Sequence, residues 1–527
     1  MAQFRRDNQE FLKNGNTIFE VVMVGNKNGR VVTKSNPFPV TGTPTTVSAF
    51  SENVSVELNP ILQEDAIYGI ESKKIETFTD LGGTATTSDK SEFVASASST
   101  QYSYSVIRTK RDLRYRPGQG VIGRWSCRYT AGVANTSQRA GFFNQEQAYQ
   151  FGYNGDEFGI LHSYGGKAHI HEFTITTAPT GTQDVTITLD GDDFVFSGIV
   201  AQSAEELAAY LGNGAGSTAF TGWRVEGYDD KLVFLSEGAT RPRTGSYNFS
   251  STGNATATDS VLQNGVIATE EWTPQSQWNG EEIFDGTGPS GVTLDPTKYN
   301  VYEIKFGWLG SGSVYFLIED PSTGDARLVH TQRWANRHTN FHVDNPNFHI
   351  GYVAYNLGGG AVTVYGGSLL GANEGKTAVT HYTSGAWHSI TTISSKDVVH
   401  HLGSLYNPLV VSNKVNTRDI QLETLNVAFE GNDPINIVVY IDTPLLTGRH
   451  QFNSYPDIST KSSLVTGTFD QTAHTPIAVY TTDINGRISI NLHELRTVIP
   501  PFTILSVGYI STQSITSISA SIVWYID

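Results

Sequence analysis

Apolar and small polar residues alternate over short segments along most of the chain, and tight-turn residues separate these segments. Segments 101–108 and 121–129 show the alternation clearly. A period of two places successive side chains on opposite faces of a strand. Further segments of this kind recur between residues 420 and 525 at a spacing typical of sandwiches. The pattern predicts a mainly β protein made of several β-sandwiches of the jelly-roll type.

One segment departs from this pattern and predicts a helix. Ser203-Ala204-Glu205-Glu206 has the form of a capping box, apolar residues follow it, and Gly212 is a stop signal. Strand patterns flank the helix, and Asp190-Gly191 with the acidic residues after it is typical of a hairpin turn. We expect a small α+β module, inserted between two halves of one sandwich, because closing a long insertion costs little chain entropy.

The first 90 residues predict an arm with a small β element. An apolar strand at 18–24 is expected to return at 30–34 after an Asn-Gly turn, and segment 84–91 is expected to be an exposed linker. The predicted division is an N-terminal arm and small β element (1–90), a split jelly-roll sandwich (91–167 and 272–372), an inserted α+β module (168–271) and a C-terminal β-sandwich (376–527).

Composition narrows the classes of function. Aromatic residues make up 11% of the 527 residues, too many for a disordered chain, and the net charge of −16 argues against nucleic-acid binding. The polar first residues lack the apolar run of a signal peptide, and no apolar run is long enough to cross a membrane. We therefore expect a soluble protein made in the cytoplasm. Cys127, the only cysteine, is expected to be a buried or half-buried strand residue.

Metal and nucleotide sites are weakly indicated. His169 and His171 share a face if they lie on a strand, and Asp190, Asp192 and Asp193 only superficially resemble a calcium loop. No third or fourth ligand is clearly spaced to complete a zinc site. The GxGxxG letters at 286–291 lack the strand before and the helix after that a dinucleotide site needs. We expect no metal and no cofactor.

Acidic pairs raise the question of glycan hydrolysis. Glu270 and Glu271 with Asp285, or Glu281 with Glu282, are candidate pairs. A glycosidase needs two carboxyl groups at a set separation across the sugar, and a sequence does not give that separation. Solvated turns in an acidic protein explain these residues equally simply. We expect no enzymatic activity, and keep a polysaccharide-degrading enzyme as a third hypothesis.

Large aromatic residues are candidates for binding a sugar without hydrolysing it. Most are expected to be core residues, but one or two can stack on a sugar ring if they are exposed. As a candidate glycan platform we single out Trp278, Trp308 and Trp334. The aromatics in or beside the split sandwich are Trp125, Tyr153, Trp272, Trp278, Trp308 and Trp334.

Several stretches carry a family resemblance. The opening Met1-Ala2-Gln3-Phe4-Arg5-Arg6-Asp7, the stretch 284–302 and Trp308-Leu309-Gly310 with the residues after it resemble structural proteins of marine tailed phages and large DNA viruses. The resemblance covers about 100–165 and 272–370 and is weaker further on. It implies a concanavalin-like jelly roll, and it offers no catalytic residues to carry over.

The resemblance implies a non-enzymatic virion structural protein, a component of capsid, neck, tail or fibre. We expect it to be made in the host cytoplasm and to assemble in the virion with itself, as a trimer or larger, and with other virion proteins. Phe4, Arg5, Arg6 and Phe11 are the candidate assembly residues, which would dock on a neighbouring subunit. The alternative hypothesis is a receptor- or glycan-binding spike whose partner is a host-surface glycan.

Overall fold

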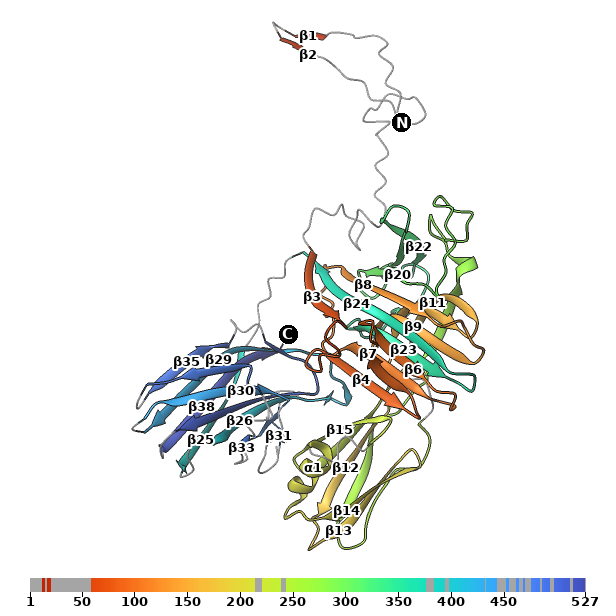
Figure 1. Ribbon diagram of the computed structural model, residues 1–527. Helices are drawn as coiled ribbons and strands as arrows, with labels where there is room; N and C mark the ends of the chain where they lie inside the picture. Colours follow the sequence, from red (N-terminus) through yellow and green to blue (C-terminus); the bar gives the residue numbers. More distant parts are fainter. Residues whose placement is uncertain are drawn as a thin grey trace.

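The computed structural model confirms a mainly β fold with several antiparallel sheets and one small α+β module (Figure 1). No helix among the residues it describes is long and apolar enough to cross a membrane. The described residues are 12–14, 17–19, 58–213, 220–237, 243–375, 383–393, 398–431, 433–442, 452–454, 461–463, 468–469, 475–483, 486–492, 497–511 and 515–526.

Two sheets packed face to face form the jelly-roll sandwich, and strands from both sides of the module contribute to each sheet. A seven-stranded sheet has the order β19 (Thr269–Pro274), β11 (Glu157–Tyr164), β10 (Ala148–Asn154), β9 (Thr136–Phe143), β23 (His349–Asn356), β7 (Tyr104–Thr109) and β4 (Ile75–Asp80). The facing sheet has the order β22 (Ala326–Gln332), β21 (Val314–Glu319), β20 (Asn300–Phe306), β8 (Val121–Tyr129), β24 (Val362–Glu374), β6 (Phe93–Ala97) and β5 (Thr84–Thr87), with β3 (Leu58–Asp65) also paired to β24.

The N-terminal boundary differs from the sequence prediction. β3 pairs with β24 and β4 pairs with β7, so residues 58–80 belong to the sandwich sheets and not to a separate element. Segment 84–91, expected to be a linker, contains β5 paired with β6, because a Thr-rich run suits an edge strand. Near the start, β2 (Thr17–Phe19) pairs back to β1 (Leu12–Asn14), and the remainder of the predicted 18–24 and 30–34 hairpin lies outside the described residues.

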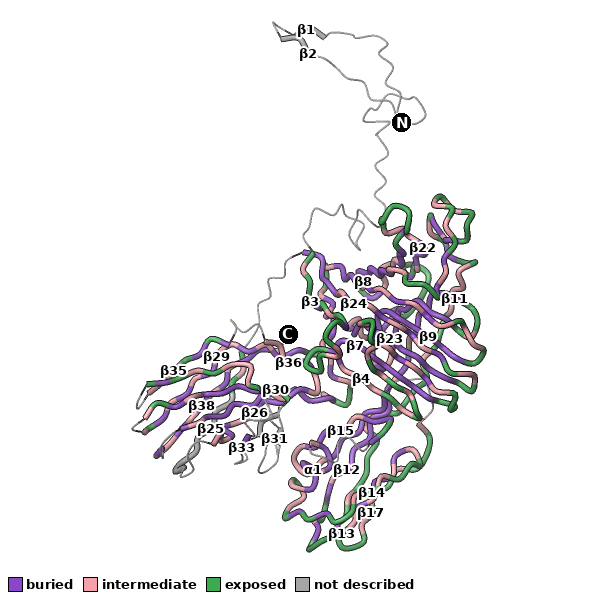
Figure 2. Tube along the Cα trace, viewed as in Figure 1, coloured by how far each residue is buried: buried purple, intermediate pink, exposed green. Residues whose placement is uncertain are grey.

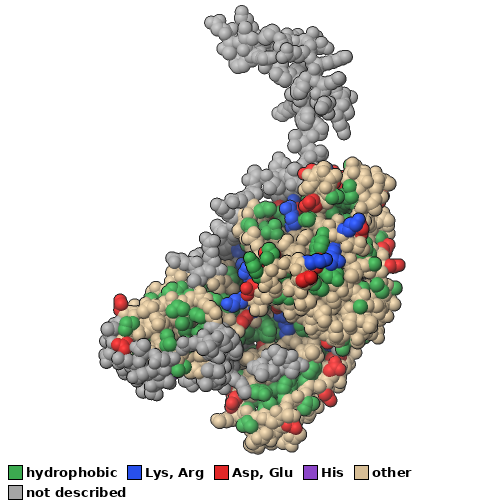
Figure 3. Space-filling model, viewed as in Figure 1, with side chains coloured by type: hydrophobic (Ala, Val, Ile, Leu, Met, Phe, Trp, Pro, Cys, Tyr) green, Lys and Arg blue, Asp and Glu red, His purple; other side chains and the backbone are tan. Residues whose placement is uncertain are grey.

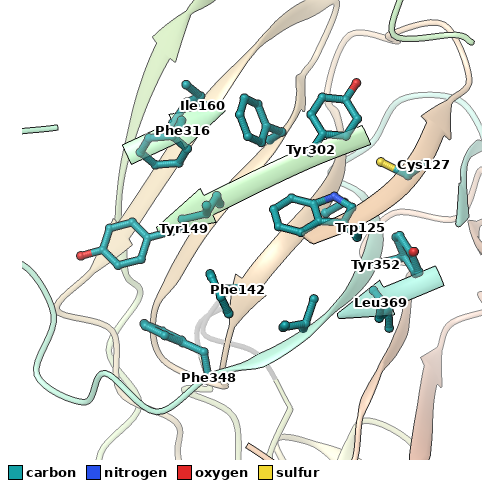
Figure 4. Close-up of a cluster of buried hydrophobic side chains, with 14 of the residues drawn as sticks. Trp125, Cys127, Phe142, Tyr149, Ile160, Tyr302, Phe316, Phe348, Tyr352 and Leu369 are labelled. Carbon is teal, nitrogen blue, oxygen red and sulfur yellow. The ribbon is translucent and has the colours of Figure 1, made fainter. Parts of the chain in front are cut away.

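An aromatic core fills the space between the two sheets. Trp125 stacks on Tyr302 with ring centroids 6.3 Å apart, and Phe151 lies 4.9 Å from Tyr302. Figure 4 shows the Trp125 and Tyr302 rings with Cys127 beside them. Cys127 is fully buried, as predicted, and burial raises the pKa of its thiol to about 12. Along β9 every residue is buried (Figure 2), so the side chains of this central strand are buried on both faces.

The module combines one helix with a three-stranded sheet and with four strands of a larger sheet. The capping prediction is confirmed, since the Glu206 N–H donates to Ser203 Oγ at 3.1 Å, and Leu207 and Leu211 are fully buried. The helix α1 (Ala204–Asn213) ends one residue beyond Gly212. The strands are β18 (Thr256–Gln263), β12 (Ile170–Thr177), β16 (Lys231–Ser236) and β15 (Trp223–Tyr228) in one sheet, and β14 (Asp192–Ile199), β13 (Gln183–Leu189) and β17 (Asn248–Ser251) in the other.

The C-terminal strands form two facing sheets around a separate aliphatic core. Residues buried on the inner faces alternate with less buried ones, as along β29 (Figure 2). One sheet has β25 (Thr383–Ile393), β38 (Ile515–Ile526), β29 (Ile420–Glu430), β35 (Arg487–Asn491) and β36 (Val498–Ile499). The other contains β31 (Phe452–Ser454), β32 (Lys461–Ser463), β26 (Val399–Asn407), β33 (Thr468–Phe469), β37 (Thr503–Ser511), β30 (Ile435–Ile441) and β34 (Ala478–Thr481). It continues the module sheet of β18, β12, β16 and β15, because β31 pairs in parallel with β15 at Phe452 and Tyr228, so the module and the C-terminal part share one eleven-stranded sheet. A two-stranded ribbon has β27 (Val410–Val411) and β28 (Lys414–Val415).

The module shares an apolar contact with the C-terminal part. Ile170 and Leu235 pack with Leu409 in one buried cluster, and the carboxylate of buried Glu226 accepts hydrogen bonds from Tyr406 Oη at 2.8 Å and the Leu409 N–H at 2.7 Å. The sequence suggested that removing residues 170–269 would open no core outside the module. That expectation is wrong, because the excision exposes Leu409 and leaves Tyr406 without its acceptor.

A ring of four buried charges joins the module to the sandwich. Arg108 on β7 contacts Glu76 on β4 at 2.5 Å and Glu237 of the module at 3.2 Å. Arg224 on β15 contacts Glu76 at 2.8 Å and also pairs with Glu237. The side chains of Arg108 and Glu237 are 1% and 0% exposed. Opposite charges neutralise one another around the ring, and removing one member leaves a buried charge uncompensated.

We expect Arg108→Met to destabilise the junction by about 3–5 kcal/mol, the cost typical of breaking a buried ion pair. The measurement is urea unfolding, with hydrogen exchange of β15 and β16 amides as the local readout. Lys298→Met is the control, since the Lys298 side chain is 79% exposed beside Asp295 and such pairs contribute under about 1 kcal/mol. Equal small losses in both variants would contradict this role for the ring.

Candidate functional site

The outer face of the seven-stranded sheet, which points away from the aromatic core, carries a second apolar layer. Alternation along β10 sends Tyr149 and Phe151 into the core and Gln150 outward. We call this surface the outer face. Its apolar side chains are Tyr104, Val106, Phe143, Ala148, Leu161, Val353 and Tyr355, with Phe78 and Trp272 partly buried against them.

Cross-strand pairing brings these side chains together. One row across the sheet runs from Trp272 to Leu161 and then to Gln150. In the next row Gly152 lies opposite Arg139, and a Cβ atom at Gly152 would stand only 1.9 Å from the Gln138 carbonyl oxygen. Glycine is therefore required there, and the backbone beside Arg139 carries no side chain. The result is a low point on the outer face between taller aromatic and polar groups.

A hollow of about 50 Å³ opens on this face. The loop between β9 and β10 forms one side of it, and the Asn144 side chain holds that loop by accepting from the Glu146 and Gln147 N–H groups, each at 2.9 Å. The lining is Tyr104, Arg139, Phe143, Asn144, Gln145, Glu146, Gln147, Ala148, Gln150, Ser163, Ala268, Glu270, Val353 and Tyr355.

Three buried N–H donors on the outer face have no hydrogen-bond partner among the described residues. They are Gln147 Nε2, Gln150 Nε2 and Trp272 Nε1. Both glutamine side chains belong to residues only 2% exposed. The Asp344 N–H donates to Gln147 Oε1 at 2.7 Å and so fixes the orientation of the side-chain amide. The other end of that amide, Nε2, is the unpaired donor. Buried donors in folded proteins are nearly always paired, so three together point to a ligand or to water.

An ion pair fixes the other side of the hollow. Arg139 donates to both carboxylate oxygens of Glu270, at 2.7 and 2.9 Å, and its Nε donates to Ser137 Oγ at 2.5 Å. The guanidinium also lies 5.6 Å from the Trp272 ring centre. Bidentate geometry restrains both side chains, so Trp272 rests against a rigid support. The pair carries no net charge.

The tryptophans singled out from the sequence lie elsewhere. Trp278 and Trp334 are 6% and 3% exposed, and their indole N–H groups donate to the Thr273 carbonyl at 3.2 Å and the Asn340 carbonyl at 2.6 Å. Trp308 is half-buried and donates to the Val343 carbonyl at 3.1 Å. None of the three is on the outer face. Trp272 was among the six candidates, but sequence alternation does not say which side of its strand faces the core.

The candidate acidic pairs do not face one another. Glu270 and Glu271 are neighbours on β19 and point to opposite faces, and Glu271 accepts from Tyr164 Oη at 2.8 Å. Glu282 accepts from the Phe284 and Ser290 N–H groups, both at 2.8 Å. Asp285 caps a local turn at Thr287. The candidate assembly residues Phe4, Arg5, Arg6 and Phe11 lie outside the described residues.

Two histidines at the start of β12, His169 just before the strand and His171 within it, are buried in an aromatic stack. His169 and His171 lie on one face, as predicted, and both rings stack on Tyr247, with centroids 4.8 and 4.3 Å away. Burial lowers the pKa of His171 to about 4, and the neighbouring His169 acts in the same direction. Within the described ranges, no group of three or more His, Cys, Asp or Glu residues is placed to hold a metal ion.

The His171 environment predicts acid sensitivity. Because its folded pKa of about 4 lies below the unfolded value of about 6.5, the unfolded chain binds the proton first as pH falls. Stability should fall between pH 6.5 and 4, by up to about 1.4 kcal/mol per pH unit. His171→Phe keeps a stacked ring without the charge. We expect its stability relative to wild type to be constant above pH 7 and to improve progressively below pH 6 in urea titrations; a pH-independent difference would contradict the assignment.

Comparisons with known proteins give no family. No protein-family model and no curated protein matches the chain. Among solved structures, a cellulose-induced protein is 9% identical, with 59% of this chain and 97% of that chain covered and a TM-score of 0.27. Lectin II from Ulex europaeus is 8% identical (59% and 99% covered, TM-score 0.22), and a lectin from Bauhinia forficata in complex with GalNAc is 9% identical (59% and 97%, TM-score 0.18). Likeness at this level carries no argument about ligand, which rests on the geometry of the outer face.

Proposed function

We propose that this protein binds a glycan on the outer face of its seven-stranded sheet and does so as a non-enzymatic component of a virus particle. The observation that carries the glycan assignment is the set of three buried donors, Gln147 Nε2, Gln150 Nε2 and Trp272 Nε1, on a face walled by aromatic rings. An apolar site with a few convergent polar groups is the usual form of a small-molecule site.

Sugars match both halves of this surface. A sugar ring has an apolar C–H face that packs on aromatic rings and a rim of oxygen atoms that accept hydrogen bonds. Trp272 and the two glutamines supply the complementary groups. The hollow of about 50 Å³ holds only a few water-sized groups, since one water needs about 10–15 Å³ of such space, and it is therefore too small to enclose a sugar ring. The glycan therefore lies along the sheet and sends one substituent into the hollow.

Charge favours a neutral glycan. The chain carries −16, and Glu270 and Glu146 both line the hollow. The one cation of that lining, Arg139, is neutralised by its bidentate contact with Glu270. Acidic and basic side chains are interspersed over the face seen in Figure 3, which shows no broad basic patch. An anionic polysaccharide would gain little here and would meet like charges.

The virion assignment rests on the sequence resemblance. The stretch that carries it, 284–302, contributes Phe284 and Leu294 to the core of the sandwich. These residues therefore stabilise the sandwich core, and the outer face is formed by other segments. Assembly as a homo-oligomer and contact with other virion proteins are part of the proposal, with Phe4, Arg5, Arg6 and Phe11 as the candidate contacts.

A glycan array with the full-length chain tests the binding function. We expect hits among neutral oligosaccharides, and we expect Trp272→Ala to weaken them at least about ten-fold, because a packed aromatic side chain contributes about 1.5–3 kcal/mol. Trp308→Ala is the matched control, since Trp308 is half-buried away from the outer face. An array without hits, or equal losses in the two variants with both folded by circular dichroism, would refute the proposal.

Mass spectrometry of purified particles tests the location. Peptides from the sandwich and from the C-terminal part should be present in stoichiometric amounts in virions produced by the virus that encodes this chain. A control preparation from uninfected cells, purified in the same way, should lack them. If the protein stays in the infected-cell lysate and is absent from particles, the virion assignment is wrong, whereas the glycan-binding result stands independently.

A further inference from the structure

The chemistry of the hollow selects a particular kind of substituent. We propose that it receives the acetamido group of an N-acetylated amino sugar, an inference that rests on the proposed glycan binding. The acetyl carbonyl oxygen accepts hydrogen bonds from the glutamine amides, and the methyl group packs on the apolar wall. The sugar ring then lies outside, against Trp272.

In the described part of the chain, two side-chain donors at the hollow are unpaired, and three of its side-chain acceptors are engaged. Gln147 Nε2 and Gln150 Nε2 have no partner among the described residues, while nearby acceptors are engaged. Glu270 binds Arg139 with both oxygens, and Gln147 Oε1 accepts from Asp344. Glu146 accepts from the Ala168 N–H at 3.2 Å and from Gln263 Nε2 at 2.9 Å.

A surplus of donors calls for a group that only accepts. A sugar hydroxyl has a proton of its own that also needs an acceptor, and the acceptors named above are already engaged. An ammonium group is a donor only and would face the glutamine amide protons. A carbonyl oxygen has two lone pairs and no proton, which suits a site with two amide donors.

Anionic acceptors fit less well than a neutral carbonyl. A carboxylate or sulfate would enter a hollow lined by Glu146 and Glu270, whose single guanidinium partner is already committed. Burying an anion without a free counter-charge is costly. Among neutral carbonyl substituents of sugars, the amide carbonyl is a stronger acceptor than an ester carbonyl because the nitrogen lone pair is delocalised onto its oxygen.

Size and wall composition agree with this choice. The hollow of about 50 Å³ holds a substituent of a few heavy atoms and excludes a ring. Ala148, Val353 and Phe143 provide an apolar wall for a methyl group, and each is buried. Removing a methyl group from water onto such a wall is favourable, so the acetyl group satisfies polar and apolar parts of the hollow together.

The test uses oligosaccharides that differ at one position. An array carries gluco- and galacto-configured oligomers of equal length, each with a hydroxyl, an amino or an acetamido group at C2. We expect the full-length protein to bind the acetamido member of a recognised series at least about ten-fold more tightly than the other two members. A buried donor left without its acceptor accounts for a difference of this size.

Variants tie the preference to the hollow. Gln150→Met and Gln147→Met keep side-chain length and remove the donor, so each should reduce the acetamido preference several-fold while binding through Trp272 persists. Gln101→Met, at an exposed turn whose amide donates to the Leu357 carbonyl, is the control and should retain the full preference.

The outcomes separate the two proposals. If the three members of a series bind equally well and Trp272→Ala still loses this binding, the acetamido assignment is overturned. Glycan binding itself then remains supported. A preference that survives both glutamine variants would also overturn it, since the acetyl group would then lie elsewhere. Absence of binding to every oligomer on this array and on the broader one would refute glycan binding itself.

Discussion

The buried ring of Arg108, Glu76, Arg224 and Glu237 is the contact on which the arrangement of the molecule depends. Arg108 and Glu76 lie on the outer face of the seven-stranded sheet. They belong to the same row across the strands as Gln150 and Trp272, but they lie at the opposite edge of the sheet. The module is therefore fastened over β4 and β7. The ring lies at the β4 and β7 side of this face, and the candidate site extends toward β19. Moving the module away would separate Arg108 from Glu237 and Glu76 from Arg224.

The module also shapes the candidate site through a second contact. Glu146, in the loop between β9 and β10, accepts hydrogen bonds from Ala168 and Gln263 at the base of the module. Gln147 is the next residue, so the position of a buried donor depends on where the module sits. The insertion is thus part of the structure that forms the hollow, even though its own core around α1 is separate from the sandwich core.

Local physics accounts for what the sequence predicted well. Alternation of period two and turn residues depend only on near neighbours, and they predicted strands between residues 420 and 525, where β29 and β37 lie. The Ser203 cap and the burial of Cys127 are local in the same sense. Segment 58–80 was harder, because β3 and β4 show their place only when they pair with strands about 300 and 30 residues away.

The sequence did not single out the residues of the candidate site. One or two aromatic residues of the split sandwich were expected to stack on sugar, with Trp278, Trp308 and Trp334 as candidates, but none of the three lies on the outer face, and Trp278 and Trp334 are buried. Whether a tryptophan faces the core or the other side of its sheet depends on which sheet covers it, a tertiary property. The unpaired side-chain donors of Gln147 and Gln150 could not be predicted from the sequence either. A glutamine without a hydrogen-bond partner is recognised only when the positions of all its neighbours are known.

The chain enters and leaves the module through a narrow neck, where Lys167 and Val266 are paired by two backbone hydrogen bonds of 2.9 Å. On one side the neck continues directly into β19, which carries Glu270 and Trp272. A mechanical load on the module would reach the neck as a peeling force, which breaks hydrogen bonds one after another. The charge ring provides a parallel path that carries load into β4 and β7 at the far edge of the sheet. While the ring holds, β19 is shielded from tension; once it fails, the same pull strips the tryptophan-bearing strand from β11.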